Sequence, residues 1–377
     1  MNDGKNETTA PVSSVGADGV QPNEKNHNEI IANPQKQINQ QATKKTEKSG
    51  SGGLQTMSMP ELYDTVFVPR IPIVDGFLYG GIYLFVGAPK VGKSFFMAQL
   101  AYHVAMGIPL WDYPVRKGTV LYLALEDDYA RLQRRLSGMF GMECADNLYF
   151  ATQAKTLNEG LDKQLEEFLK EHKDARLIII DTLQKVREVG GDRYSYSSDY
   201  EIVTKLKSFS DKYGICLLVV HHTRKLESED SFDMISGTNG LLGAADGAFI
   251  MHKKKRTDNE AVMDIVGRDQ PDQELTIEFD RERCVWKFKK AETELWKQSP
   301  NPLLEAINAF LTEDRQEWEG TATELVNQLP DMQLQANVLS RRLNTVNSQL
   351  LNDYGIFYDN KRGHERKIIL KRLELKE

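Results

Sequence analysis

The segment from Gly87 to Ser94, with the sequence GAPKVGKS, constrains this chain more than any other feature. It matches the pattern G-x-x-x-x-G-K-[ST] at every fixed position. Residues 81–86 before it form an apolar, β-branched and aromatic run that predicts a buried strand, and residues 95–101 after it have helical periodicity. A glycine loop between a strand and a helix points backbone N–H groups and the positive end of the helix dipole at an anion. The sequence therefore predicts a loop that holds the phosphates of a nucleotide.

The residues of this loop have separate expected roles. Lys93 is expected to reach the β- and γ-phosphates of ATP, and the Ser94 hydroxyl is expected to bind Mg²⁺. We expect a Cβ at Gly87 or Gly92 to block the approach of the backbone to phosphate. The predicted nucleotide-binding residues are Gly87, Ala88, Pro89, Lys90, Val91, Gly92, Lys93, Ser94 and Phe95.

Two further apolar runs are predicted to be strands that end in acidic residues. Residues 118–125 lead to Glu126, and residues 177–180 lead to Asp181. The carboxyl ends of strands in a parallel sheet face the ligand crevice. We therefore expect Glu126 to be the catalytic base that deprotonates the attacking water, and Asp181 to hold Mg²⁺ directly or through water. The acids at 127–128 are expected to cap the helix that follows.

Another buried run, residues 215–220, ends in His221 and His222. A histidine at such a strand tip is either structural or a sensor of the γ-phosphate, and the position favours His222 as a sensor. Two loops are candidates for DNA contact, with a solvated loop or a simple turn as the alternatives. They are residues 192–198, which include Arg193, and residues 236–240.

Residues 247–288 read as alternating strands that extend the sheet in an antiparallel manner. Arg268 is placed at the tip of one of them. An arginine there either reaches the phosphates of a neighbouring subunit as an arginine finger or is an ordinary surface residue.

Composition and charge narrow the class of protein. A length of 377 residues allows two domains and a tail, and a net charge of -7 excludes an overall basic field for nucleic acid. The three cysteines lack metal-ligand spacing, and no apolar run approaches the ~20 residues of a membrane span. These features predict a cytoplasmic protein with reduced thiols and no membrane partner. The expected organisation is a disordered polar tail at 1–56, an ATPase domain at 57–297 and a DNA-binding domain at 298–377.

The C-terminal region is predicted to be a winged helix. Helical segments at 303–312, 321–326 and 336–351 precede two strand-like runs, 356–358 and 367–370. Between positions 341 and 372 there are eight basic and three acidic residues. Such a positive helix and wing suit duplex or fork DNA, although a winged helix can also contact protein. Across the chain, the predicted DNA-binding residues are Arg193, Arg341, Arg342, Lys361, Arg362 and Arg366.

Taken together, residues 62–288 resemble the RecA-like, AAA-type ATPase domain of hexameric replicative helicases. The resemblance is strongest to the RepA-type branch of plasmids and mobile elements, with DnaB-like helicases as relatives. It rests on the segments 87–94, 124–127, 178–184, 219–224, 236–237 and 265–268. It implies an α/β fold, namely a RecA-like P-loop NTPase core with a mainly parallel sheet, to which the winged helix and the disordered N-terminal tail are joined.

The resemblance also assigns roles. It implies that Lys93 and Ser94 bind phosphate and Mg²⁺, that Glu126 is the base and that Asp181 is the Walker B acid. His222 is then similar to the sensor and Arg268 to the trans-acting finger. The sequence departs from DnaB-like helicases in two ways. Val266 and Gly267 precede Arg268 where those enzymes place a nearby lysine, and a polar tail stands where they have an N-terminal helical domain.

The expected function is that of a DNA-dependent ATPase, a ring-forming and hexameric replicative helicase or translocase of a plasmid or mobile element. It would use ATP and Mg²⁺, hold single-stranded DNA in the ring and bind a duplex or fork at the winged helix. An alternative is an ATP-gated DNA-binding regulator or recombination mediator that does not unwind DNA. A small-molecule kinase is disfavoured, because no acceptor pocket signature is present.

Overall fold

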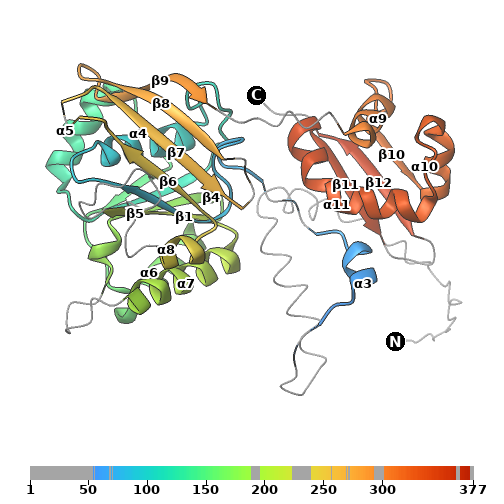
Figure 1. The fold of residues 1–377 in the computed structure, drawn as a ribbon, viewed down its shortest axis with the longest axis horizontal. Coiled ribbons are helices and arrows are strands. Elements are labelled where there is room, and N and C mark those ends of the chain that lie inside the picture. Colours follow the sequence, from blue (N-terminus) through green and yellow to red (C-terminus); the bar gives the residue numbers. More distant parts are fainter. Residues whose placement is uncertain are drawn as a thin grey trace, which may run out of the picture.

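The computed structural model has two units, each with its own hydrophobic core (Figure 1). An α/β unit carries the phosphate-binding loop, and a smaller C-terminal unit follows it. The structure describes residues 54, 56–67, 69, 71–187, 196–222, 239–255, 257–268, 270, 272–292, 301–361 and 366–373. The predicted disordered tail, 1–56, lies almost wholly outside the described residues.

A nine-stranded sheet forms the centre of the α/β unit, in the order β3-β2-β4-β5-β1-β6-β7-β8-β9. The strands from β3 to β6 in this order are parallel, and β7, β8 and β9 continue the sheet in an antiparallel manner. This confirms the predicted mainly parallel sheet with its antiparallel extension. The strands are β1 (Gly81–Gly87), β2 (Thr119–Ala124), β3 (Leu148–Ala151), β4 (Ala175–Asp181), β5 (Cys216–His222), β6 (Gly247–His252), β7 (Glu260–Gly267), β8 (Gln273–Asp280) and β9 (Val285–Glu292).

Helices cover both faces of the sheet, which explains why β1 is buried along its whole length. Side chains alternate across a strand, so Tyr83 and Phe85 pack with α4 and α5, whereas Leu84 and Val86 pack with α6, α7 and α8. Figure 1 shows α6, α7 and α8 together on one side. The helices are α4 (Lys93–Met106), α5 (Tyr129–Phe140), α6 (Leu161–Glu171), α7 (Tyr196–Tyr213) and α8 (Asn239–Ala244), with short 3-10 helices at Leu157–Glu159 and Leu183–Lys185.

The register of the sheet brings the predicted catalytic residues to one edge. Gly87 at the end of β1 pairs with His222 at the end of β5, and Ala124 at the end of β2 pairs with Asp181 at the end of β4. The four strands are adjacent in the order β2-β4-β5-β1. Their carboxyl ends therefore form one continuous site, as expected for an open parallel sheet.

Helix α7 was not predicted from the sequence. It begins at Tyr196, so the last residues of the predicted polar loop at 192–198 are helical, while Arg193 lies outside the described residues. Packing explains the helix, because Val203 and Leu206 are buried against the sheet. The second candidate loop, 236–240, meets α8 at Asn239, and its earlier residues lie outside the described part.

The C-terminal unit has the predicted helices and hairpin and one additional strand. Thr321 caps α10 in a capping box with Glu324, as predicted. The three strands form an antiparallel sheet in the order β10-β12-β11, of which β10 was not predicted. In chain order the elements are α9 (Pro302–Phe310), β10 (Glu317–Gly320), α10 (Ala322–Gln328), a 3-10 helix (Pro330–Met332), α11 (Ala336–Tyr354), β11 (Ile356–Lys361) and β12 (Lys367–Arg372).

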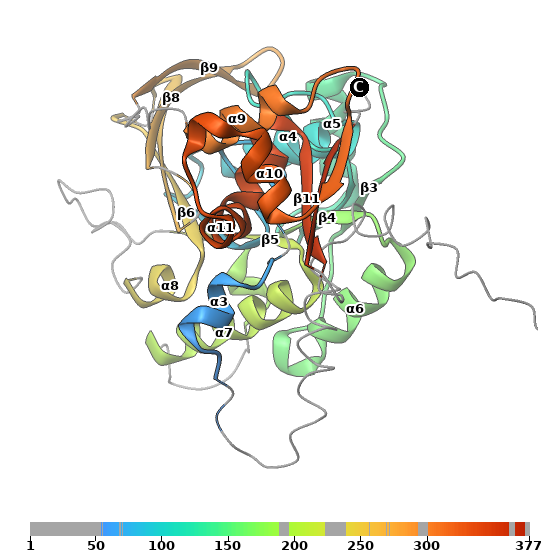
Figure 2. The same ribbon diagram turned by 90° about the vertical axis from the view of Figure 1, so that its right-hand side faces the viewer.

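A short helix ahead of the α/β unit contacts the C-terminal unit. This helix, α3 (Met59–Tyr63), is capped by Ser58 and Glu61 in a capping box. It lies beside α11 in both ribbon views (Figures 1 and 2), and Val66 packs against the C-terminal core. Residues that the sequence-based boundary at 57 assigned to the ATPase domain are thus in contact with the other unit. Among the described helices, none is long and apolar enough to cross a membrane.

Candidate active site

The phosphate-binding loop holds Lys93 in a bent, enclosed position. The Lys93 ammonium donates to the carbonyl oxygens of Gly87 at 2.7 Å and Ala88 at 3.0 Å, and it lies 3.0 Å from Nδ1 of His222. Only 4% of the Lys93 surface is exposed. The lysine is therefore satisfied by its own loop and by the tip of β5. Phosphate oxygens would have to replace these partners.

Packing beneath the loop gives a further reason for its two glycines, besides the expected approach of the backbone to phosphate. A Cβ on Gly87 would lie 2.5 Å from the carbonyl oxygen of Met251 in β6. A Cβ on Gly92 would lie 2.6 Å from the Trp286 indole, and Gly92 has a φ of +112°. A Cβ at either position would thus clash with β6 or β9, and the expected obstruction of the phosphate stays a prediction.

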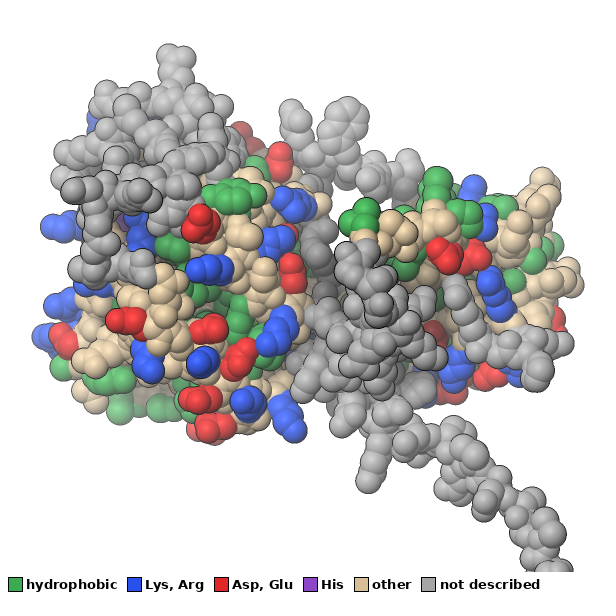
Figure 3. Space-filling view, turned by 90° about the horizontal axis from the view of Figure 1, so that it is seen from below, with side chains coloured by type: hydrophobic (Ala, Val, Ile, Leu, Met, Phe, Trp, Pro, Cys, Tyr) green, Lys and Arg blue, Asp and Glu red, His purple; other side chains and the backbone are tan. Residues whose placement is uncertain are grey.

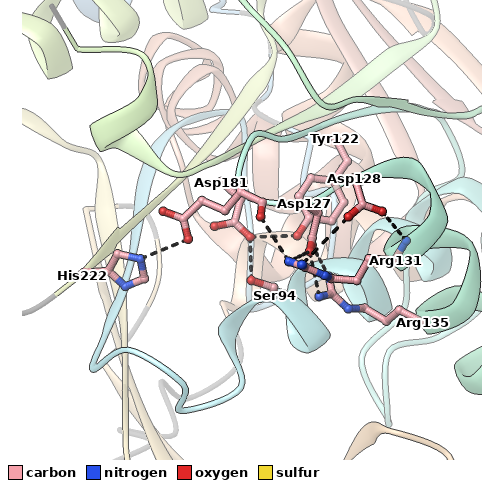
Figure 4. Close-up of polar contacts among 9 residues, drawn as sticks. Ser94, Tyr122, Asp127, Asp128, Arg131, Arg135, Asp181 and His222 are labelled. Atoms are coloured by element: carbon pink, nitrogen blue, oxygen red, sulfur yellow. Dashed lines mark hydrogen bonds and ion pairs between the residues drawn. The ribbon is translucent and has the colours of Figure 1, made fainter. Parts of the chain in front are cut away.

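Ser94 and Asp181 meet at the point where the divalent cation was predicted (Figure 4). The Ser94 hydroxyl donates to Asp181 Oδ2 at 2.8 Å, and the Tyr122 hydroxyl donates to the same oxygen at 2.9 Å. Asp181 is buried, and burial raises its pKa, while the two hydroxyl donors act in the opposite direction. Tyr122 was missed from the sequence, because an inward-facing tyrosine in a buried strand looks like an ordinary core residue.

The residues around Asp181 fit a hard cation such as Mg²⁺. The hydroxyl and the carboxylate supply oxygen donors, which Mg²⁺ prefers, and a dication would offset the penalty of burying the Asp181 charge. Among the described residues, no group of three His, Cys, Asp or Glu side chains forms a metal centre. Ser94 and Asp181 would therefore hold the ion together with nucleotide oxygens, and the ion would neutralise charge on the phosphates.

Glu126 lies beside His222 and Thr182 at the mouth of the site. Thr182 donates its hydroxyl hydrogen to Glu126 Oε1 at 3.3 Å, and Nε2 of His222 is 3.6 Å from Glu126 Oε2. Glu126 keeps 46% of its side chain exposed, so its carboxylate can meet a water molecule. A chain of contacts thus connects the phosphate-binding lysine to the predicted base through one histidine.

The protonation states follow from this arrangement. An ammonium group can only donate, so Nδ1 of His222 must accept from Lys93, and the ring proton resides on Nε2, facing Glu126. Burial and the positive charge of Lys93 both lower the pKa of His222, which keeps the ring neutral. Burial also lowers the pKa of Lys93 to about 8, although Asp181 and Glu126 oppose this effect.

The two acids after Glu126 have different roles. Asp128 caps α5 by accepting from the Arg131 backbone N–H at 2.8 Å, as predicted. Asp127 instead binds the Arg135 guanidinium at 2.6 Å, with a further contact to Arg131 at 3.2 Å (Figure 4). The expectation that both acids cap the helix was wrong for Asp127, because its side chain turns inward toward Arg135. Arg135 in turn lies over the ring of Phe95, 5.1 Å from the ring centroid.

Trp286 in β9 supports the phosphate-binding loop from below. Its indole N–H donates to the Gly92 carbonyl oxygen at 3.2 Å, and the backbone of Trp286 exchanges two hydrogen bonds with the side chain of Gln99 in α4. The Lys253 ammonium lies 5.2 Å from the centroid of the same ring. The sequence carried no signal for this role, because Trp286 is distant along the chain and stands in a strand of ordinary pattern.

This contact makes Trp286 a reporter of the loop. We expect ATP to change the intrinsic fluorescence of the wild-type protein, because phosphates that engage the loop alter the surroundings of the indole. Trp286→Phe should abolish most of that response and raise the KM for ATP by about fivefold, the equivalent of one hydrogen bond. Trp318→Phe, in β10 of the C-terminal unit, is the matched control and should keep the response. A full response in Trp286→Phe would contradict the assignment.

Arg268 lies at the end of the sheet opposite the phosphate-binding loop. Gly267 pairs with Gly247 at the start of β6, whereas Gly87 pairs with Met251 near the end of β6. The Arg268 guanidinium is exposed and donates to the Gly243 carbonyl oxygen in α8 at 3.0 Å. The length of β6 thus separates Arg268 from the phosphate site of its own chain, and the structure does not bring it together with the other predicted catalytic residues.

The predicted DNA-binding residues have different environments. Arg341 and Arg366 both form ion pairs with Asp64, from the segment after α3. Arg342 and Lys361 are exposed on α11 and at the end of β11. Arg193 and Arg362 lie outside the described residues.

Residues 54–228 match a family model described as an AAA domain. No curated protein matches the chain. Among solved structures, an ATPase domain aligns with a TM-score of 0.47 and 14% identity, over 56% of this chain and 85% of that one. A DnaB-like replicative helicase, solved for its interactions with primase, aligns with a TM-score of 0.48 and 13% identity, over 70% of this chain and 73% of its own.

A KaiC-like protein from the archaeon Pyrococcus horikoshii aligns with a TM-score of 0.43 and 14% identity, over 60% of this chain and 100% of that chain. These structural likenesses are distant, so the classification depends on the family match and on the site itself. The match over 54–228 spans the phosphate-binding loop, Glu126, Asp181 and His222. Over these residues the chain matches the AAA domain model, and it places a P-loop at the edge of a mainly parallel sheet.

Proposed function

We propose that this protein hydrolyses ATP at the edge formed by β1, β5, β4 and β2, and that it does so as a DNA-dependent motor. The observation that carries the proposal is the contact chain from Lys93 through His222 to Glu126. Lys93 would turn from its loop carbonyls to the phosphates, and Glu126 would accept the proton of the attacking water. His222 would lose the ammonium at Nδ1 and change its contact with Glu126. Phosphate occupancy would in this way alter the position of the base.

A ring, as expected for a hexamer, would complete the site. Arg268 is separated from its own phosphate site by the length of β6, so any contact with a γ-phosphate must be with that of a neighbouring subunit. An arginine supplied to a neighbour stabilises the charge that develops during phosphoryl transfer. The exposure of Arg268 at the sheet edge supports this role, since a partner subunit can reach it.

Mixing two inactive variants tests this arrangement. Arg268→Ala should lose most of its ATPase activity, and Lys93→Met should lose all of it. In a mixed ring, a Lys93→Met subunit still supplies its Arg268 to the intact site of an Arg268→Ala neighbour. We therefore expect turnover by the mixture to exceed the sum of the separate activities. Purely additive activity in mixtures that co-assemble by size-exclusion chromatography would argue against action in trans.

We further propose that the C-terminal unit is a winged helix that binds duplex or fork DNA. The order of its elements and the basic residues of α11, β11 and β12 support this reading. In the face of the molecule drawn in Figure 3, basic and acidic side chains are interspersed. A net charge of -7 is consistent with DNA contact through a local set of residues rather than through the whole surface. Replication of a plasmid or mobile element is the setting that the sequence favours.

An ATP-gated DNA-binding regulator that does not unwind DNA is the second candidate. The ion pair between Arg341 and Asp64, in the segment ahead of the ATPase sheet, favours this candidate. Such a contact would link DNA binding by the C-terminal unit to the nucleotide state of the ATPase site. Turnover with and without single-stranded DNA separates the two. A motor should be stimulated strongly, by about tenfold or more, because its step along DNA is coupled to hydrolysis. Slow turnover that does not change when single-stranded DNA is added would instead support the regulator. The Glu126→Gln variant gives the background rate of ATP hydrolysis.

A further inference from the structure

One carboxylate joins two arginines that come from different elements of the C-terminal unit. Asp64 Oδ1 lies 2.9 Å from Nε of Arg341 in α11, and Asp64 Oδ2 lies 3.3 Å from a terminal guanidinium nitrogen of Arg366, next to β12. Two oxygens of one anionic group, each accepting from a separate guanidinium, is also the way in which arginines hold the two free oxygens of a phosphodiester. The two guanidinium groups around Asp64 therefore have the chemistry to hold a phosphodiester.

The backbone of the Asp64 segment is held independently of this carboxylate. Asn344 of α11 donates its side-chain N–H to the Tyr63 carbonyl oxygen at 2.8 Å, and Asn347 donates to the Phe67 carbonyl oxygen. Tyr358 fixes Asn344 by donating to its side-chain oxygen at 2.7 Å. Buried asparagines thus anchor the segment, and the docking does not require a charge at position 64.

The segment covers part of the helix that would enter a DNA groove. Arg341, Asn344 and Asn347 recur every three residues on α11 and so share one face of the helix. In a winged helix the third helix is the one that reads DNA, and here that helix is α11. With 43% of the Arg341 side chain and 57% of the Arg366 side chain exposed, both guanidinium groups remain accessible to a competing anion.

The two arginines favour the charged form of the Asp64 carboxylate. The hydrogen bond from Arg341 is the largest of the influences that lower the pKa of Asp64, and Arg366 acts in the same direction. The carboxylate therefore stays charged at neutral pH. An ion pair that only stabilises the fold would also keep Asp64 charged. Binding of DNA is therefore the measurement that distinguishes a structural ion pair from a phosphate-binding site.

We propose that Arg341 and Arg366 form a phosphodiester-binding site, and that Asp64 of the same chain occupies it until duplex DNA displaces the carboxylate. This inference rests on the proposed DNA-binding function of the C-terminal unit. Asp64 is an internal competitor, so it lowers the affinity for DNA without contacting DNA. The segment that it belongs to continues into β1, so the occupant of the arginine site is connected through the chain to the ATPase sheet.

The test uses the full-length protein and a short fluorescent duplex, with binding followed by anisotropy at low salt and without nucleotide. Asp64→Asn should bind about 3- to 10-fold more tightly than wild type, because two exposed ion pairs no longer compete with phosphate. Asp314→Asn is the matched control. It removes one exposed carboxylate from the same unit, and its affinity should stay within about twofold of wild type, since it leaves the arginine site unchanged.

The increase in affinity for DNA in Asp64→Asn must also depend on Arg341 and Arg366. In a protein that carries Arg341→Gln and Arg366→Gln, adding Asp64→Asn should give no further tightening, as expected for groups that act through one contact. If Asp64→Asn binds no more tightly than Asp314→Asn while wild type does bind duplex, the inference is wrong and the proposed function stands. If none of these variants binds duplex, the inference and the DNA-binding role of the C-terminal unit both fail, whereas the ATPase proposal is judged separately by turnover.

Discussion

Lys93→Met is expected to abolish ATP hydrolysis and at the same time to stabilise the nucleotide-free protein. Lys93 is the lysine of the motif that is assigned to the phosphates, and methionine cannot replace its charge. In the absence of nucleotide, however, the ammonium is buried against two carbonyl oxygens and a neutral histidine. Burial lowers its pKa from 10.5 to about 8, so the charged ammonium is less stable in the folded protein than in the unfolded chain. Removing that charge should raise the free energy of unfolding by roughly 1–3 kcal/mol at neutral pH.

The pH dependence gives this prediction a definite sign. The unfolded chain holds the Lys93 proton more tightly than the folded protein does, so the penalty is complete below about pH 8 and declines as the pH rises toward 10.5. Thermal unfolding of both proteins at pH 7 and pH 9.5 should show the advantage of Lys93→Met shrinking at the higher pH. Mg·ATP should stabilise the wild type and leave the variant unaffected. Turnover at a wild-type rate, or stabilisation of the variant by ATP, would show that Lys93 does not bind the phosphates.

Glu126→Gln is expected to lower kcat by about 10²- to 10⁴-fold, the range for loss of a general base, with ATP binding retained. The carboxylate is half-exposed, and the amide of glutamine can keep its contact with Thr182. The fold and the phosphate-binding loop should therefore be unaffected. The fluorescence response of Trp286 to ATP measures binding, while single-turnover hydrolysis measures the chemical step. The expected result is a normal binding response with a slow chemical step.

Asp128→Asn is the control for this substitution. Asp128 is a carboxylate two residues away, and it caps α5 rather than facing the site. Asparagine is an equally good N-cap residue, so both kcat and stability should remain close to those of the wild type. A comparable loss of kcat in Asp128→Asn, or an intact kcat in Glu126→Gln, would mean that the base is another residue.

Much of the α/β unit was predictable from local pattern. The strands of the parallel sheet, the order of motifs and the residues Lys93, Ser94 and Asp181 followed from apolar runs that end in polar residues, because the ends of parallel strands meet at one edge. A second requirement for glycine at Gly87 and Gly92 was not predicted. A Cβ there would meet the Met251 backbone carbonyl of β6 or the Trp286 side chain of β9, and no local pattern connects those strands to the loop.

The sequence by itself determined the class of the fold, because a glycine loop with Lys93 and Ser94 between a buried strand and a helix has few alternatives. Tertiary structure alone decided which distant groups surround those residues. Trp286 lies beneath Gly92 across 194 positions, and Asp64 meets Arg341 across 277 positions. Periodicity reports which face of an element is buried, but not which partner buries it. Sheet order and packing determine that partner, and both depend on the fold of the whole chain.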